Sequence, residues 1–284
     1  MQAKASGMRL MLACLAAWAC QAAMATASMP ASASVSSAAA PVAGQAWTGY
    51  SDRPVPARLG PNTFRFPMNL YESQVGPDRD GARLNLAWPA LEALPAGARA
   101  AAGYSETWGS RSIDIDLRYM ERPLLDALLP ALINEGPPGR SFAAPDDPAQ
   151  HRSLRIEGEP VHGLTPYYAD PGKLAAYFRA HGIDASGDNL ARNGDDWYLA
   201  RDEAGRLRTV IVCTSRTIAG ARLIGGKLQN TPPGVERGGC RQTFTVPAYG
   251  LRISVFYLRA YLVDWKRIEE RISGLLERYR ATPP

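Results

Sequence analysis

Asp114 and Asp116 are the two carboxylates whose spacing could support chemistry. They alternate with Ile113 and Ile115, so a β-strand here would present both carboxylates on one face, about 7 Å apart at a rise of roughly 3.3 Å per residue. A pair of this kind could hydrolyse a glycosidic bond or bind a metal ion. No supporting motif surrounds the two aspartates, so a solvated strand face is the favoured interpretation, and an acidic docking stripe is a further alternative.

The histidines offer little material for catalysis, because His151, His162 and His181 lie far apart in the sequence. His162 could act as a base only if an aspartate and a hydroxyl met it in a cleft; a histidine held in a turn is the simpler interpretation. The chain has no G-x-S-x-G, H-E-x-x-H or G-x-x-x-x-G-K-[ST] motif. We therefore expect a protein without enzymatic activity, cofactor or metal.

Arginine supplies most of the positive charge. Of the 32 basic residues only four are lysines, and the formal net charge is +5. Arginine suits the bidentate recognition of carboxylates and phosphates, which allows an acidic partner. No run of five basic residues occurs, so a nucleic-acid partner is not expected.

Residues 1–25 have the organisation of a secretory signal peptide. Lys4 and Arg9 form a positive n-region, residues 10–23 are apolar, and the run Ala-Met-Ala that ends at residue 25 fits the small-x-small cleavage rule. Cleavage would remove both basic residues and lower the formal charge to +3. The sequence therefore predicts export, and lipidation of Cys20 is the alternative processing.

Residues 26–46 are rich in alanine, serine and proline and carry no charge, which predicts a tether. No later stretch approaches the ~20 apolar residues that a membrane-spanning helix needs. We therefore expect the mature chain to be soluble in the periplasm, without a transmembrane segment.

Two cysteines, Cys213 and Cys240, remain after cleavage. An even pair of cysteines in an exported chain is more often oxidised than reduced. A disulfide that closes a loop of this length could stabilise the fold by roughly 3–4 kcal/mol in the chain-entropy model.

The strands and helices predicted around these residues indicate an antiparallel α+β fold. Apolar and polar residues alternate in a strand pair around Pro67, at residues 63–67 and 83–88, and again at 112–119. A helix follows from Pro123, and Pro130 is expected to kink it. These elements belong to a first α+β half, 47–148.

A loop rich in proline, glycine and aspartate ends this half, and 149–284 form a second α+β half. It contains a helix capped by Asp170, two hairpins, and a strongly amphipathic last helix that Asp264 is expected to cap. We expect antiparallel sheets with amphipathic helices packed on one face. The order of strand and then helix occurs in both halves, so two similar halves are possible.

A pattern of aromatics, turns and cysteines extends over most of residues 60–280. It comprises Phe64-Arg65-Phe66-Pro67, Tyr71, Gly76-Pro77-Asp78, Leu84-Asn85-Leu86-Ala87-Trp88-Pro89, Pro95-Ala96-Gly97, Gly163-Leu164, Tyr167, Cys213, Cys240, Phe244, Tyr257-Leu258-Arg259, Leu262, Asp264-Trp265, Ile268 and Leu275-Leu276. The pattern resembles envelope proteins of Gram-negative bacteria, including periplasmic immunity proteins of type VI secretion lipase effectors. It includes no catalytic residue.

The resemblance implies a binding protein that sterically neutralises a lipase-type toxin. Partner contacts are expected from the stripe of Asp114, Asp116 and Arg118, and from Glu236 and Arg237 in a long glycine-rich loop. The alternative is an envelope assembly factor without catalysis that binds a lipid, a peptidoglycan fragment or a protein. An enzyme built on His162 is the third possibility.

Overall fold

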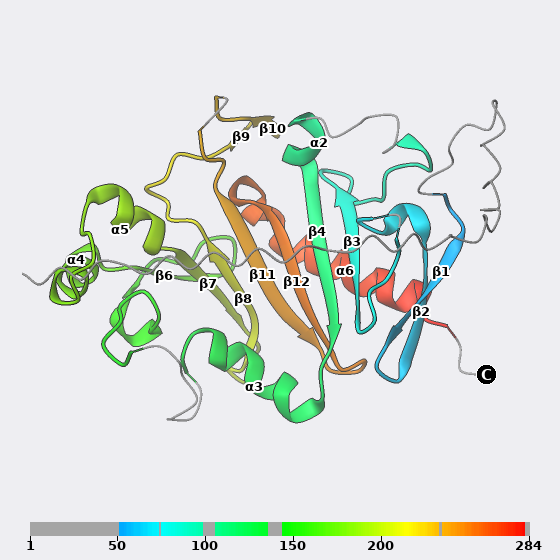
Figure 1. Cartoon of the computed structure of the whole chain (residues 1–284), viewed down its shortest axis with the longest axis horizontal. Helices are drawn as coiled ribbons and strands as arrows, with labels where there is room; N and C mark the ends of the chain where they lie inside the picture. The colour runs from blue at the N-terminus through cyan, green and yellow to red at the C-terminus, as the bar shows by residue number, and fades with distance from the viewer. Residues whose placement is uncertain (1–50, 74, 99–105, 136–143, 233–234, 282–284) are drawn as a thin grey trace, which may run out of the picture. The chain divides into compact units, whose positions relative to one another are not determined.

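The computed structural model describes residues 51–73, 75–98, 106–135, 144–232 and 235–281 (Figure 1). All of them fall within one compact unit. The predicted signal peptide and tether lie outside the described residues. No helix in the described part of the chain is long and apolar enough to cross a membrane.

An eight-stranded, fully antiparallel sheet forms the centre of this unit, in the order β3-β4-β12-β11-β8-β7-β6-β5. The strands are β3 (Gly81–Ala87), β4 (Ser112–Tyr119), β5 (Ile156–Glu157), β6 (Thr165–Tyr168), β7 (Asp196–Arg201), β8 (Leu207–Cys213), β11 (Gly239–Val246) and β12 (Leu251–Leu258). Strands that precede and follow residues 136–148 in the sequence therefore belong to one sheet.

Two hairpins lie outside this sheet: β1 (Pro54–Leu59) with β2 (Asn62–Pro67), and β9 (Arg222–Ile224) with β10 (Lys227–Gln229). The predicted strands at 63–67 and 83–88 are both present. Their expected pairing with each other is wrong, because β2 pairs with β1 and β3 pairs with β4. Alternation specifies which face of a strand is buried and does not select the neighbouring strand.

The helices and 3-10 turns are η1 (Met68–Leu70), α2 (Glu106–Arg111), α3 (Arg122–Leu132), η2 (Arg152–Leu154), α4 (Pro171–Ala180), α5 (Gly187–Asn193), η3 (Arg259–Asp264) and α6 (Trp265–Tyr279). The predicted helix at Pro123 is α3, with Pro130 inside it. The α+β class is confirmed.

The two amphipathic helices α3 and α6 lie on opposite faces of the sheet. Ile268 of α6 shares a core cluster with Tyr198 and Ile211, which are paired across β7 and β8. Leu129 of α3 packs instead with Leu199, which points to the other face. In Figure 1, α6 lies behind the sheet, and α3 lies at the lower end of the face turned towards the viewer. The expectation that helices pack on one face therefore describes only part of the fold.

One of the two predicted helix N-caps is present in the structure and the other is not. Asp170 caps α4, because its Oδ1 accepts hydrogen bonds from the N–H groups of Gly172 and Lys173. Asp264 precedes α6 but makes no capping bond with its side chain. Its carboxylate accepts instead from the indole of Trp88 at 2.9 Å and from Arg267 at 3.0 Å. A buried indole N–H requires an acceptor, so the predicted cap is replaced by a tertiary contact.

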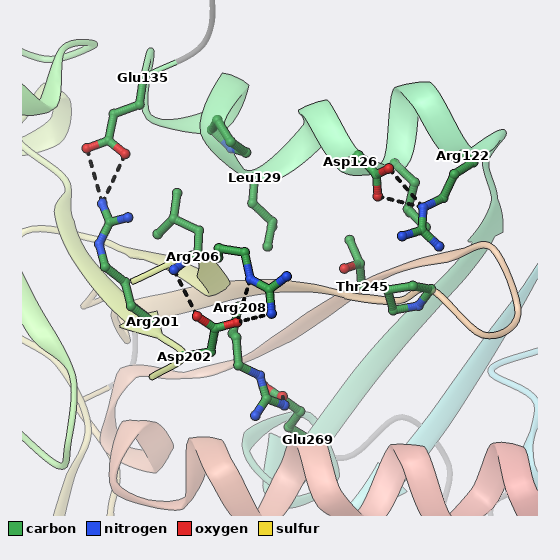
Figure 2. Close-up of a pocket in the computed structure, with 14 residues that line it drawn as sticks. Arg122, Asp126, Leu129, Glu135, Arg201, Asp202, Arg206, Arg208, Thr245 and Glu269 are labelled. Atoms are coloured by element: carbon green, nitrogen blue, oxygen red, sulfur yellow. Dashed lines mark hydrogen bonds and ion pairs between the residues drawn. The ribbon is translucent and has the colours of Figure 1, made fainter. Parts of the chain in front are cut away.

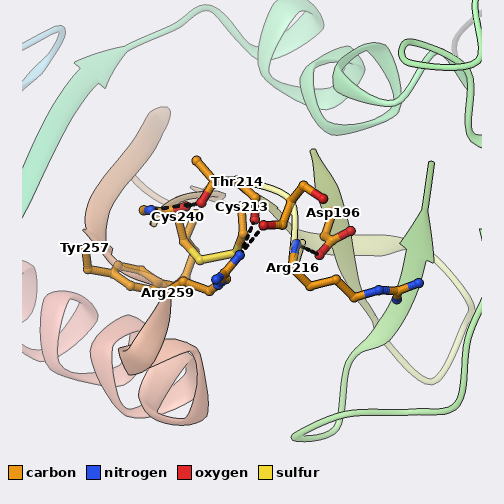
Figure 3. Close-up of a disulfide and its surroundings, with 10 residues drawn as sticks. Asp196, Cys213, Thr214, Arg216, Cys240, Tyr257 and Arg259 are labelled. Carbon is orange, nitrogen blue, oxygen red and sulfur yellow. Dashed lines mark hydrogen bonds between the residues drawn. A yellow bond between two sulfur atoms is a disulfide. The ribbon is translucent and has the colours of Figure 1, made fainter. Parts of the chain in front are cut away.

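The predicted disulfide between Cys213 and Cys240 is present. The two cysteines face each other on β8 and β11, with Cα atoms 4.0 Å apart, and both are buried. Figure 3 shows the bond beside the end of β12. It closes the segment that carries β9, β10 and the predicted contact loop.

Candidate partner-binding site on the open sheet face

One face of β3, β4 and β12 has no described helix packed on it. Alternation divides these strands cleanly, because Leu84, Ile115 and Ile253 point into the core while polar side chains point the other way. We call this second surface the open face. It comprises Arg83, Asn85, Asp114, Asp116, Arg118, Arg241, Arg252, Ser254 and Phe256, and much of it lines a shallow hollow of about 490 Å³.

A chain of charges extends across the open face and has Asp116 as its central acceptor. Its carboxylate accepts hydrogen bonds from Nη2 of Arg252 at 2.5 Å and from Nε of Arg118 at 3.2 Å. Arg118 also reaches Asp78 at 3.0 Å. Asp116 and both arginines are half-buried, which strengthens their attraction relative to fully exposed pairs. The network therefore holds two guanidinium groups in defined positions at the surface.

Asp114 is bound locally and differs from Asp116 in its environment. Its Oδ1 accepts from the hydroxyl of Ser112 at 2.6 Å and from the amide of Asn85 at 2.5 Å. Since each aspartate already has neutral or cationic donors, the two do not act as a free carboxylate pair. No group of three or more His, Cys, Asp and Glu in the described residues could hold a metal ion. The arrangement suits recognition of a partner.

Phe256 places an apolar ring among these charges. It pairs across the sheet with Asp114 on one side and with Arg241 on the other, and 45% of its surface is exposed. Arg241 is exposed and forms no hydrogen bond or ion pair within the described part of the chain. An exposed aromatic ring beside an uncommitted arginine is a combination enriched at the centres of protein interfaces.

The structure brings three of the five predicted contact residues together and places the other two on a different element. Asp114, Asp116 and Arg118 share β4 and the open face. Glu236 and Arg237 lie in the connection from β10 to β11, where the carbonyl of Arg237 accepts from the N–H of Ala221 at 3.0 Å.

The loop nevertheless comes within electrostatic range of the residues near the open face. Burial raises the pKa of Asp195; the positive charges of Arg155 and Arg241 lower it again, and Glu236 raises it. Glu236 and Arg241 therefore act on the same carboxyl group. The predicted loop leads directly into β11, the strand that carries Arg241.

Sequence reasoning missed Arg241, Arg252 and Phe256. Arg252 and Phe256 lie on β12, which was recognisable from the alternation with Ile253 and Val255, whereas Arg241 lies on β11. The hairpin of β11 and β12 was predicted and is present, but nothing local showed that β12 would pair with β4, since Asp116 and Arg252 are 136 residues apart. Only the sheet order combines the three strands into one surface.

A second hollow, of about 690 Å³, lies between α3, the β7–β8 hairpin and α6 (Figure 2). Each of its arginines has an acidic partner within 4 Å. The pairs are Arg122–Asp126, Arg201–Glu135, Arg206–Asp202 and Arg208–Glu269. Because its charges are matched internally, this pocket offers less to a charged partner than the open face does.

Fold and site together define a disulfide-bonded, antiparallel α+β protein whose candidate site is a preformed recognition surface. The solved structure of Smlt3025, an immunity protein of the Stenotrophomonas maltophilia type IV secretion system, is similar to it with a TM-score of 0.69. The two sequences are 31% identical over 82% of this chain and 95% of Smlt3025. The chain belongs to the same protein family as Smlt3025.

The iron-regulated outer membrane lipoprotein FrpD of Neisseria meningitidis is a more distant match. It is 10% identical, with a TM-score of 0.43 over 82% of this chain and 94% of FrpD. At that level neither fold nor function is transferred. No protein-family model and no curated protein matches the chain.

Proposed function

We propose that this protein is an immunity protein of the bacterial envelope, which neutralises a toxin of a secretion system by binding it. The observation that carries the proposal is membership of the Smlt3025 family over most of both chains. The sequence resemblance to immunity proteins is independent of that comparison and leads to the same class. A binding role requires no catalytic group of its own, so inhibition would be steric.

The open face is the proposed contact surface. It combines positioned guanidinium groups, an exposed aromatic ring and a fixed backbone, so little conformational entropy would be lost on binding. Its charges alternate in sign, which favours a partner with a complementary pattern over a uniformly charged polymer. Glu236 and Arg237 extend this proposed contact at the loop end.

The class of toxin is the finer part of the proposal. The sequence resemblance implies a lipase effector of a type VI system, whereas Smlt3025 is an immunity protein of a type IV system. Smlt3025 therefore supports the immunity role without supporting the type VI lipase class. We retain a lipase as the toxin because the resemblance implies it, and leave the type VI assignment as a proposal that rests on the resemblance alone.

The periplasm is the proposed location. The signal-like residues 1–25 would direct export, and the buried Cys213–Cys240 bond fits an oxidising compartment. The alternative role, an envelope lipid- or peptidoglycan-binding assembly factor, would be favoured by an enclosed apolar pocket. The hollows at the open face and beneath α3 are open and bordered by charged side chains, so this alternative is secondary.

A growth experiment tests the proposal. The toxin encoded by the neighbouring gene is expressed in the periplasm of a susceptible bacterium, with or without the full-length protein carrying its own leader. We expect the toxin to stop growth and the protein to restore it. Toxicity that is unchanged by an exported, folded protein would contradict the immunity role.

A further inference from the structure

A cleft beside the disulfide is the feature that the proposed contact surface does not use. It has a volume of about 840 Å³ and lies between the segment 216–223, which leads into β9, and the turn η3. Three arginines, Arg216, Arg222 and Arg259, line it together with His162. The described lining contains no carboxylate, which distinguishes this cleft from the charge-matched pocket of Figure 2.

Two devices fix the wall of this cleft. The disulfide joins the strand ends on either side of the segment 214–239. The guanidinium of Arg259, next to the disulfide in Figure 3, donates to the carbonyls of Thr214 at 2.9 Å, of Ile218 at 2.7 Å and of Ser215. The wall is therefore preorganised, which lowers the entropic cost of binding a ligand there.

The other two arginines have free donors. Arg216 stacks on the ring of Tyr168 with its guanidinium carbon 3.3 Å from the ring centroid, and extends away from the disulfide in Figure 3. Neither the Arg216 nor the Arg222 side chain forms a hydrogen bond or ion pair with any residue in the described ranges, and both are exposed. A stacked guanidinium keeps its edge donors available, and that edge is the part that binds a carboxylate.

Apolar side chains border the same cleft. Val263 of η3 lines it with 48% of its surface exposed, and Ile218 and Leu223 line it as well. Apolar groups next to uncommitted arginines would exclude water from a charged contact. This combination favours a protein segment over a free inorganic anion.

We propose that this cationic cleft binds an acidic segment of the toxin, with its carboxylates on Arg216 and Arg222. The inference rests on the proposed immunity function and adds a second contact to that function, with the partner chemistry stated. The excess positive charge in the cleft favours an acidic ligand, and the apolar border favours a polypeptide over a free inorganic anion.

The test is calorimetric titration of the full-length, processed protein with catalytically inactivated toxin from the neighbouring gene. The double variant Arg216→Gln/Arg222→Gln is expected to bind at least roughly tenfold more weakly. The affinity of the double variant should also depend less on salt concentration than that of the wild type. Arg179→Gln, which changes an exposed arginine on α4, is the matched control and is expected to bind like the wild type.

A second pair of variants keeps the test valid if the double variant folds poorly. Val263 is exposed, so Val263→Glu and Val263→Lys should both fold. We expect the glutamate variant to bind at least roughly tenfold more weakly than the lysine variant, because only the glutamate repels an acidic segment.

The outcomes separate this inference from the proposed function. Wild-type affinity in the double variant, with equal affinities for the two Val263 variants, would overturn the acidic-segment contact while leaving toxin binding intact. Loss of binding to phosphatidylglycerol vesicles in the double variant, with unchanged toxin binding, would identify a lipid surface as the occupant and would also overturn the inference. A wild-type protein that fails to bind the toxin at micromolar concentration would overturn both.

Discussion

At the residue scale, Asp196 is a buried carboxyl group with a strongly raised pKa. Its side chain is almost fully buried at the start of β7 and accepts the N–H of Arg216 at 2.7 Å. Burial raises its pKa from 3.8 to about 6, although Arg216, Arg259 and Arg155 act in the opposite direction. Folding therefore favours the protonated form of this group.

The sign of the pH effect follows from that shift. The folded state binds the Asp196 proton more tightly than the unfolded state, so this contribution to stability is fully present below pH 3.8 and is lost as the pH rises through about 6. A shift of about two pKa units corresponds to roughly 3 kcal/mol. Part of the stability of the protein should therefore decline between these two pH values.

The variant Asp196→Asn tests this contribution, because an amide oxygen can still accept from Arg216 and cannot ionise. We expect its free energy of unfolding, relative to wild type, to improve by up to about 3 kcal/mol between pH 4 and pH 7. Urea unfolding at both pH values measures it. The exposed Asp80→Asn serves as control, and an equal pH dependence in Asp196→Asn and wild type would refute the assignment.

At the element scale, the segment between β8 and β11 is held by the disulfide and by Arg259. Cys213 and Cys240 are directly paired, so their bond closes a loop of 27 residues in the unfolded chain. Replacing both by alanine should lower the free energy of unfolding by about 2–4 kcal/mol, because the unfolded chain regains the entropy that the bond removes.

Denaturant unfolding of Cys213→Ala/Cys240→Ala against the oxidised wild type measures this loss. Fully reduced wild-type protein should lose a similar amount, which controls for the change of side chain. Equal stability of the oxidised wild type and the double variant would contradict a stabilising role for the bond.

The elements also show what could be predicted from the sequence. Strict alternation in 112–119 specified a strand with one buried face, and Asp170 before Pro171 specified a helix start. These features depend on neighbours within a few residues. The pairing of β12 with β4 depends on packing between distant segments, so the open face, with Arg252 and Phe256 beside the aspartates of β4, could not be predicted.

The cleft beside the disulfide shows the same limit. The loop between the cysteines was recognisable from its glycines, and the pairing from the number of cysteines left in a chain that the sequence predicts to be exported. The stacking of Arg216 on Tyr168 joins β6 to that loop, and the clamp of Arg259 joins η3 to it. Neither contact has a local sequence signal.

At the scale of the whole molecule, a single sheet supports both proposed contact surfaces. One face carries α6 and the main core, and the other is divided between α3 and the open face. The charge pairs beneath α3 are satisfied within the chain, whereas Arg241 on the open face and Arg216 and Arg222 in the cleft keep donors available. The two proposed contact surfaces therefore lie where no described helix covers the sheet and at the end that carries the disulfide.

The most direct test of toxin binding through the open face is calorimetric titration of the full-length, processed protein with inactivated toxin from the neighbouring gene. We expect a one-to-one complex and, for Phe256→Ala, a loss of about 1–3 kcal/mol in binding free energy with unchanged thermal stability. Ile183→Ala, at a similarly exposed apolar side chain outside the open face, should bind like wild type. Absence of binding at micromolar concentration, or equal affinities for the Phe256 and Ile183 variants, would contradict toxin binding through the open face.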